Sequence, residues 1–138
     1  NFSCTINTVN PATRVDVHKQ FTQICEATAL AYGCVADVSV IKGYPVTVND
    51  IESSDKAIEV ASSLFGKNSV KTNLTPSMGA EDFAYMLEKT PGAYIWLGAG
   101  EGKSGCMLHN TKYDFNDNIL PLGILYWEKL VKTELPLR

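Results

Sequence analysis

The sequence lacks three features that would each indicate a class of protein. Its longest apolar runs, such as "AYIWLGAG", fall well short of the roughly 20 residues that a bilayer span requires. It has no basic excess, because 12 Lys and Arg, scattered along the chain, stand against 15 Asp and Glu. It has only two histidines, His18 and His109. We therefore expect a soluble protein with no membrane and no nucleic-acid partner.

Paired cysteines are missing as well. Cys4, Cys25, Cys34 and Cys106 show neither CxxC spacing nor the density of a small secreted scaffold. We expect free, buried thiols and a reducing, cytoplasmic setting. The 138 residues, 45% of them hydrophobic, suffice for one ordinary core. Because the chain opens at Asn1 without an initiator Met, directly in strand-like sequence, we expect it to be part of a longer polypeptide.

The first third of the chain predicts a strand, a long helix and a second strand. "FSCTINTV" alternates as a half-buried strand does, and "VADVSVIKG" has the same character. Between them, Asn10 and Pro11 are typical of a helix start, and Gly33 of a helix end, which places a helix at about 12–32. The helix face expected to be apolar contains Val17, Phe21, Ile24, Thr28 and Ala31. "GYPVTVND" then indicates a connector, with a domain boundary near Gly43.

The rest of the chain alternates between helix and strand patterns. Helices are expected at about 54–65, just after "TPSMGAED", and at about 119–132, while "VKTNL" and "AYIWLGAG" read as strands. The side chains expected to face a core are Ile58, Ala61, Phe65, Phe83, Met86, Leu87, Leu122, Tyr126 and Leu130. This alternation predicts the α/β class, with both halves of the fold incomplete.

A glycine-rich loop at 98–105, "GAGEGKSG", is similar to the phosphate-cradling pattern GxxxxGK[ST]. The spacing is one residue short, because the first glycine of the pattern would fall on Leu97, and the residues that follow do not predict a helix. A surface loop is the simpler interpretation. A nucleotide-binding protein that uses Lys103 remains the alternative.

Two further stretches could carry chemistry. In "PSMGAEDFAYM", the acidic Glu81 and Asp82 suit a helix N-terminus and Gly79 suits a tight turn, while the same turn could border a ligand at the end of a strand. In "LHNTKYDFND", His109 has acidic residues nearby, but at spacings that match no local metal motif. A lone histidine is usually a surface residue or a hydrogen-bond partner. No Ser or Cys has a base near it in sequence, so nucleophilic catalysis is not supported.

Four sequence blocks in this order are more specific than any of the single motifs above: "GYPVTVND", "MGAEDFAYML", "PGAYIWLGAG" and "LHNTKYDFNDNILPLGILYW". Together they closely resemble the C-terminal part of the hippurate hydrolase and N-acyl-amino-acid amidohydrolase family, dinuclear metallohydrolases related to the aminoacylases. The resemblance implies a phosphorylase/hydrolase-like α/β catalytic domain over 44–138. Over 1–43, "NTVNPATR" and the long helix resemble the end of the family's ferredoxin-like (βαββαβ) lid, through which members dimerise.

The same resemblance implies roles for three residues. His109 matches the family's final metal ligand and would bind one of two divalent ions, commonly zinc or manganese. Gly79 and Glu81 match a loop that borders the substrate pocket. The family's other ligands and its catalytic glutamate lie upstream of this region, so no catalytic residue is assigned here. The chain alone is expected to be inactive and to lack a complete metal site.

One strand departs from the family pattern, because Cys4 and Asn7 stand where the family has Gly and Arg, which leaves the substrate open. We predict the C-terminal fragment of a metal-dependent amidohydrolase that cleaves N-acyl, hippurate-type amino acids. Its expected partners are the N-terminal part of its catalytic domain and a second copy. The alternative is a non-catalytic interaction remnant of that family. Half a sheet leaves open edges, which predicts oligomerisation or marginal stability.

Overall fold

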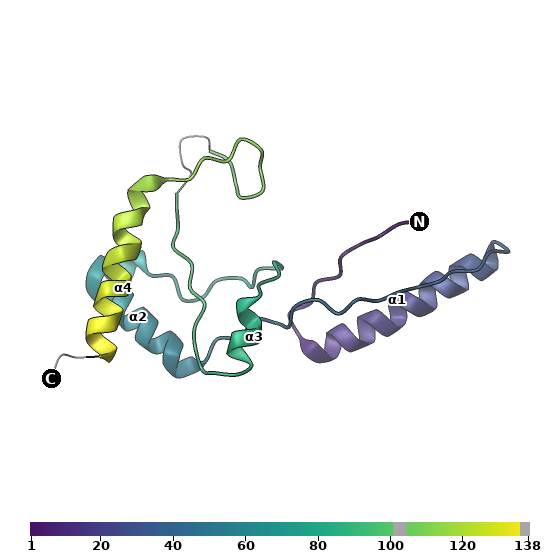
Figure 1. Ribbon diagram of the computed structural model, residues 1–138, viewed down its shortest axis with the longest axis horizontal. Helices are drawn as coiled ribbons and strands as arrows, with labels where there is room; N and C mark the ends of the chain where they lie inside the picture. The colour runs from purple at the N-terminus through teal and green to yellow at the C-terminus, as the bar shows by residue number, and fades with distance from the viewer. Residues whose placement is uncertain (101–104, 136–138) are drawn as a thin grey trace. The chain divides into compact units, whose positions relative to one another are not determined.

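The computed structural model describes residues 1–100 and 105–135. Clustering of contacts divides the chain into two compact units, Asn1–Val48 with Leu74–Pro91, and Asn49–Asn73 with Gly92–Arg138. The first unit holds α1 and α3, and the second holds α2 and α4 (Figure 1). The elements in chain order are α1 (Pro11–Ala31), α2 (Ile51–Phe65), η1 (Lys67–Ser69), α3 (Phe83–Leu87), η2 (Asp117–Ile119) and α4 (Leu120–Glu134), where η marks a 3-10 turn.

Helix α1 begins at the cap that its sequence predicts. The side-chain Oδ1 of Asn10 accepts the N–H groups of Ala12 (2.9 Å) and Thr13 (3.2 Å), two donors that have no partner inside the helix. Pro11 occupies the first helical position, where a missing N–H costs nothing. The expected helix start is therefore confirmed.

The other end of α1 is closed by a Schellman motif. Gly33 has a φ of +68°, and its N–H donates to the carbonyl of Leu30 at 3.0 Å. The N–H of Cys34 donates to the carbonyl of Ala29 at 2.9 Å. Both bonds satisfy carbonyls that the last turn would otherwise leave open, and the left-handed φ suits a residue without a Cβ.

The long helix buries none of its residues within the described parts of the chain. Val17 and Phe21 are half-buried, but Ile24, Thr28 and Ala31 on the same expected face are exposed. Near the helix start, the Arg14 guanidinium donates to the carbonyls of Gly43 (2.9 Å) and Tyr44 (2.7 Å), which holds the segment after the helix against its first turns. The expected apolar face is thus covered only over its first half.

In the second unit, α2 and α4 pack against each other (Figure 1). Ala57 and Val60 of α2 and Tyr126 of α4 are buried, and Ile119 of η2 is buried too. Burial raises the pKa of the Tyr126 hydroxyl, since the charged form would lose its hydration.

Several side chains lie differently from the expectation. Ile58, Ala61 and Phe65 are only half-buried, as is Leu130, and Leu122 is exposed. In α3, Ala84 is fully buried, Phe83 and Leu87 are half-buried, and Met86 is exposed. The helical period predicts which apolar residues share one face of a helix. Which of them are buried depends on the element that packs against that face.

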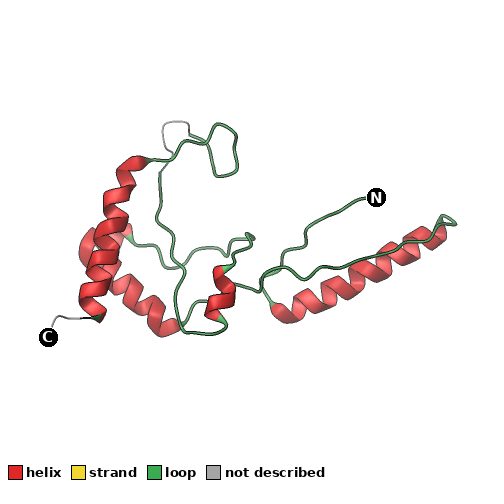
Figure 2. Cartoon of the chain, viewed as in Figure 1, coloured by secondary structure: helices red, strands yellow, loops and turns green. Residues whose placement is uncertain are grey.

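No strand forms within residues 1–100 and 105–135, so the four expected strands are absent from this chain as described (Figure 2). The corresponding segments run as extended backbone. A strand needs a neighbour that pairs with its N–H and C=O groups, and these segments find none. At Tyr94 the side chain of Asn49 takes the place of a pairing strand. The Asn49 amide accepts from the backbone N–H of Tyr94 (2.8 Å) and donates to the Tyr94 carbonyl (2.9 Å).

None of the described helices combines the length and the apolar character that crossing a membrane would require.

Candidate functional site

His109 lies on a tight turn in the second unit. The N–H of Asn110 donates to the carbonyl of Met107 at 3.3 Å, which closes a turn over Leu108 and His109. His109 has a φ of +68° and is the one non-glycine residue with a positive φ among the described residues. A positive φ at the third position, after a negative one at the second, is the type II arrangement, which normally places Gly or Asn there.

A second turn follows at once and is centred on the side chain of Asn110. Its Oδ1 accepts the N–H of Lys112 at 2.9 Å, and its carbonyl accepts the N–H of Tyr113 at 3.0 Å. Asn110 therefore ends one turn and begins the next. The imidazole of His109 is exposed and has no hydrogen bond or ion pair within the described parts of the chain.

The base of this loop is also held by an asparagine. Asn116 donates from Nδ2 to the carbonyl of Ala99 at 3.0 Å, and its Oδ1 accepts the N–H of Asn118 at 3.2 Å. The first bond ties the end of the extended 92–99 segment to the start of η2. The bond between Asn116 and Ala99 therefore closes the base of the loop that contains the His109 turn. Helix α4 follows η2 directly.

The imidazole of His109 is suited to be one of several ligands of a metal ion. An imidazole site needs three or more donors, and no three His, Cys, Asp or Glu side chains gather within the described ranges. Asp114 and Asp117 follow His109 in the sequence and are exposed.

The second candidate loop lies in the first unit. Gly79 is exposed, and its N–H donates to the Ser77 hydroxyl at 3.2 Å. The half-buried carboxylate of Glu81 accepts the N–H of Phe83 at 3.2 Å, at the start of α3. Glu81 thus satisfies a helix N-terminus, as the simpler interpretation of this stretch expects.

The candidate residues fall in different units of the chain. Gly79 and Glu81 belong to the first unit and His109 to the second, and each unit is defined by its own contacts. The assignments of His109 to metal and of Gly79 and Glu81 to substrate stay predictions.

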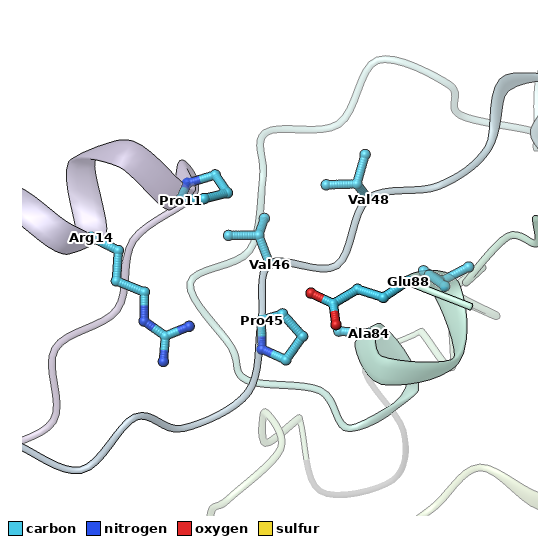
Figure 3. Close-up of a pocket in the computed structure, with 8 residues that line it drawn as sticks. Pro11, Arg14, Pro45, Val46, Val48, Ala84 and Glu88 are labelled. Atoms are coloured by element: carbon cyan, nitrogen blue, oxygen red, sulfur yellow. The ribbon is translucent and has the colours of Figure 1, made fainter. Parts of the chain in front are cut away.

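A hollow in the first unit has no counterpart in the sequence interpretation. Its volume is about 340 Å³. Figure 3 shows the 45–48 segment between the start of α1, with Pro11 and Arg14, and the helix that carries Ala84 and Glu88. Arg14 is among its lining residues, but its guanidinium already holds two carbonyls. The available signal was the one proline and two valines of "GYPVTV", and a connector was the simpler interpretation.

Two other expectations can be compared with the structure. None of the four cysteines forms a disulfide within the described residues, but Cys4 and Cys34 are exposed and the other two are half-buried, so the expected burial is wrong. Extended segments without a packed neighbour cannot cover their side chains. Residues 101–104 of the glycine-rich loop, Lys103 included, lie outside the described residues.

Comparison with known proteins decides the family. The family model described as peptidase family M20/M25/M40 matches residues 4–133. The chain belongs to this family. It is 33% identical to the hippurate hydrolase of Campylobacter jejuni over 125 residues, which cover 91% of this chain and 32% of that protein.

Two other relatives are named for different activities. It is 32% identical to thermostable carboxypeptidase 2 of Saccharolobus solfataricus over 88% of this chain and 30% of that protein. It is 33% identical to the N-acetyldiaminopimelate deacetylase of Pediococcus pentosaceus over 78% and 27%. The chain spans about a third of the length of the curated relatives it matches. No solved structure matches it significantly.

Membership confirms the resemblance that the four sequence blocks carry and places the chain in a family of hydrolases. The matched span includes the His109 turn and the Gly79–Glu81 loop.

Proposed function

We propose that this chain is the C-terminal part of a metal-dependent amidohydrolase that releases an amino acid from an N-acyl or N-aroyl derivative of the hippurate type. The family match over 4–133 carries this proposal. The three relatives described above are named for removing an acyl group or a terminal residue, which are hydrolyses of one kind of bond.

In this proposal His109 supplies one imidazole ligand to a pair of divalent ions, zinc or manganese. Such ions polarise an amide carbonyl and lower the pKa of a bound water. The turn presents an exposed imidazole that no described side chain engages. Gly79 and Glu81 border the N-acyl amino acid. The base that activates water comes from the N-terminal part of the catalytic domain, so the chain alone is inactive.

The proposed architecture has two parts. Residues 1–43 form the end of a ferredoxin-like lid through which the enzyme makes a homodimer, and residues 44–138 form part of an α/β hydrolase-like catalytic domain. The extended segments of both parts are strands that pair with neighbouring strands in the complete enzyme. Large apolar side chains in these segments support this, since Val35 is 97%, Ile41 88% and Trp96 63% exposed.

A second candidate is a non-catalytic interaction module derived from the same family. The observation in its favour is that no three His, Cys, Asp or Glu side chains gather into a metal-binding group within the described residues. In that case the apolar segments would serve binding alone.

The deciding experiment measures metal content and amidase activity toward hippurate for the chain alone, then for the chain mixed with the N-terminal segment of its parent polypeptide. We expect activity and two bound metal ions only in the mixture. His109→Ala should abolish activity, while His18→Ala, the matched histidine control on α1, should leave it unchanged. A mixture that forms a stable complex but never hydrolyses hippurate would support the interaction module instead.

The proposed strands give an independent measurement. Far-ultraviolet circular dichroism of the mixture should show more strand than the sum of its two components. A spectrum equal to that sum would contradict the proposed sheet, whatever the activity.

A further inference from the structure

The backbone at His109 is unusual for a side chain of its size. At a φ near +68° the Cβ of an L-residue crowds the following carbonyl, which is why glycine normally occupies this position of a type II turn. Residues held in such conformations persist only where their surroundings determine them. The imidazole makes no bond within the described residues that could hold its own backbone in place.

The turn that contains His109 is closed weakly on its own. Its single closing bond, from the Asn110 N–H to the Met107 carbonyl, is 3.3 Å long, at the long end for this type of bond. The bonds on the far side of Asn110 are shorter: 2.9 Å from the Lys112 N–H to Oδ1, and 3.0 Å from the Tyr113 N–H to the carbonyl. The second turn is therefore the better-held of the two.

We infer that Asn110 is a positioning residue for His109. Its side chain imitates a backbone turn, as Asn does in an Asx turn, and so sets the orientation of the peptide unit that follows His109. With that unit fixed, His109 keeps its left-handed φ and its imidazole keeps one direction. Without the Oδ1 bond, the backbone at His109 relaxes to a negative φ and the imidazole moves. This inference rests on the proposed function of His109 as a metal ligand.

Asn110 is exposed, so its substitution should leave the helices intact. Asn110→Ala removes the acceptor, and Asn110→Ser restores a weaker one without adding charge. Thr111→Ala is the matched control, since Thr111 is exposed in the same turn and makes no hydrogen bond within the described residues. His109→Ala reports the ligand itself.

The first measurement uses the chain alone. In NMR spectra of Asn110→Ala, the Lys112 amide should lose its protection from exchange and the His109 Cα shift should move away from its left-handed value. Thr111→Ala should show neither change. An unchanged His109 Cα shift in Asn110→Ala would show that the turn does not depend on this side chain, and would overturn the inference.

The second measurement uses the chain mixed with the N-terminal segment of its parent, and follows Zn²⁺ alone by competition with a coloured chelator. Asn110→Ala should weaken Zn²⁺ binding about tenfold, as for groups that orient a metal ligand, with partial recovery in Asn110→Ser. Thermal unfolding of each variant separates this loss from a general loss of fold.

The outcomes separate this inference from the function on which it rests. If His109→Ala weakens Zn²⁺ binding but Asn110→Ala does not, the positioning role is wrong and the ligand role stands. If His109→Ala binds Zn²⁺ as the unmodified mixture does, or if that mixture binds none, both are wrong.

Discussion

Helix α1 and the pair α2–α4 show two ways in which a helix can be held. Helix α1 has strong local signals at both ends, Asn10 with Pro11 and then Gly33, but buries none of its 21 residues. Helices α2 and α4 cover each other and bury Ala57, Val60 and Tyr126 between them and their surroundings. The comparison teaches that a helix can be defined by its caps where tertiary packing is slight, whereas most helical stability comes from packing.

The largest effect should come from removing the packing. Tyr126→Ala deletes the largest buried side chain of the second unit and should cost about 3 kcal/mol of its free energy of unfolding. Hydrogen exchange followed by mass spectrometry should show faster exchange in α2 and α4, and unchanged exchange in α1.

Ile124→Ala, at a position 67% exposed on the same helix, is the control and should have little effect on exchange. Equal acceleration in α1 and in the α2–α4 pair after Tyr126→Ala would break the comparison.

The next effect should come from α1 and its C-terminal cap. Gly33→Ala places a Cβ in open space but at a φ of +68°, so the cost of about 1 kcal/mol is backbone strain alone. Hydrogen exchange followed by mass spectrometry should show faster exchange confined to α1. Gly43→Ala also meets open space, without a positive φ, and should leave this exchange unchanged. Equal effects of the two substitutions would mean that the Schellman cap contributes nothing.

A pH effect should distinguish the start of α2. The Ser53 N–H, and then the Ser53 hydroxyl, each 2.9 Å from Oδ2, hold the pKa of Asp50 below its usual value. Because the folded-state pKa is lowered, this stabilisation is present above the unfolded value, about 3.9, and is lost as the pH falls through the folded value.

Asp50→Asn keeps the acceptor and cannot titrate, so the protection of the α2 amides, after division by their intrinsic exchange rates, should lose its dependence on pH in the acid range. If the wild type and Asp50→Asn respond to acid in the same way, the cap is not the titrating group.

The smallest effect should come from the ion pairs of the α2–α4 pair. Lys56 lies 3.2 Å from Glu134 and 3.2 Å from Glu52, and these carboxylates raise its pKa. All three side chains are exposed to solvent, which screens the attraction. Glu134→Gln should lower the unfolding temperature slightly, and 1 M salt should remove the difference. A difference that persists in high salt would show a packing role for Glu134.

The helices were predictable because their signals are local. Asn10, Pro11 and Gly33 act through bonds within a few residues, so the bounds of α1 could be predicted to within one residue at each end. Helix α2 begins three residues earlier than expected, because Asp50 rather than Ser54 provides its cap. The His109 turn was not predictable, since Gly or Asn, and not histidine, is the usual residue at the third position of a type II turn.

By itself, the sequence determined the four helices, the family and the residues that match its motifs, because caps, helical periods and ordered motif blocks lie along the chain and need no distant partner. Only the tertiary structure decided which side chains are covered, as when Ala57 and Val60 rather than Ile58 and Phe65 meet the interior of the second unit. It also decided that the extended segments remain unpaired in the described chain, since pairing requires a neighbouring strand that the local sequence cannot supply.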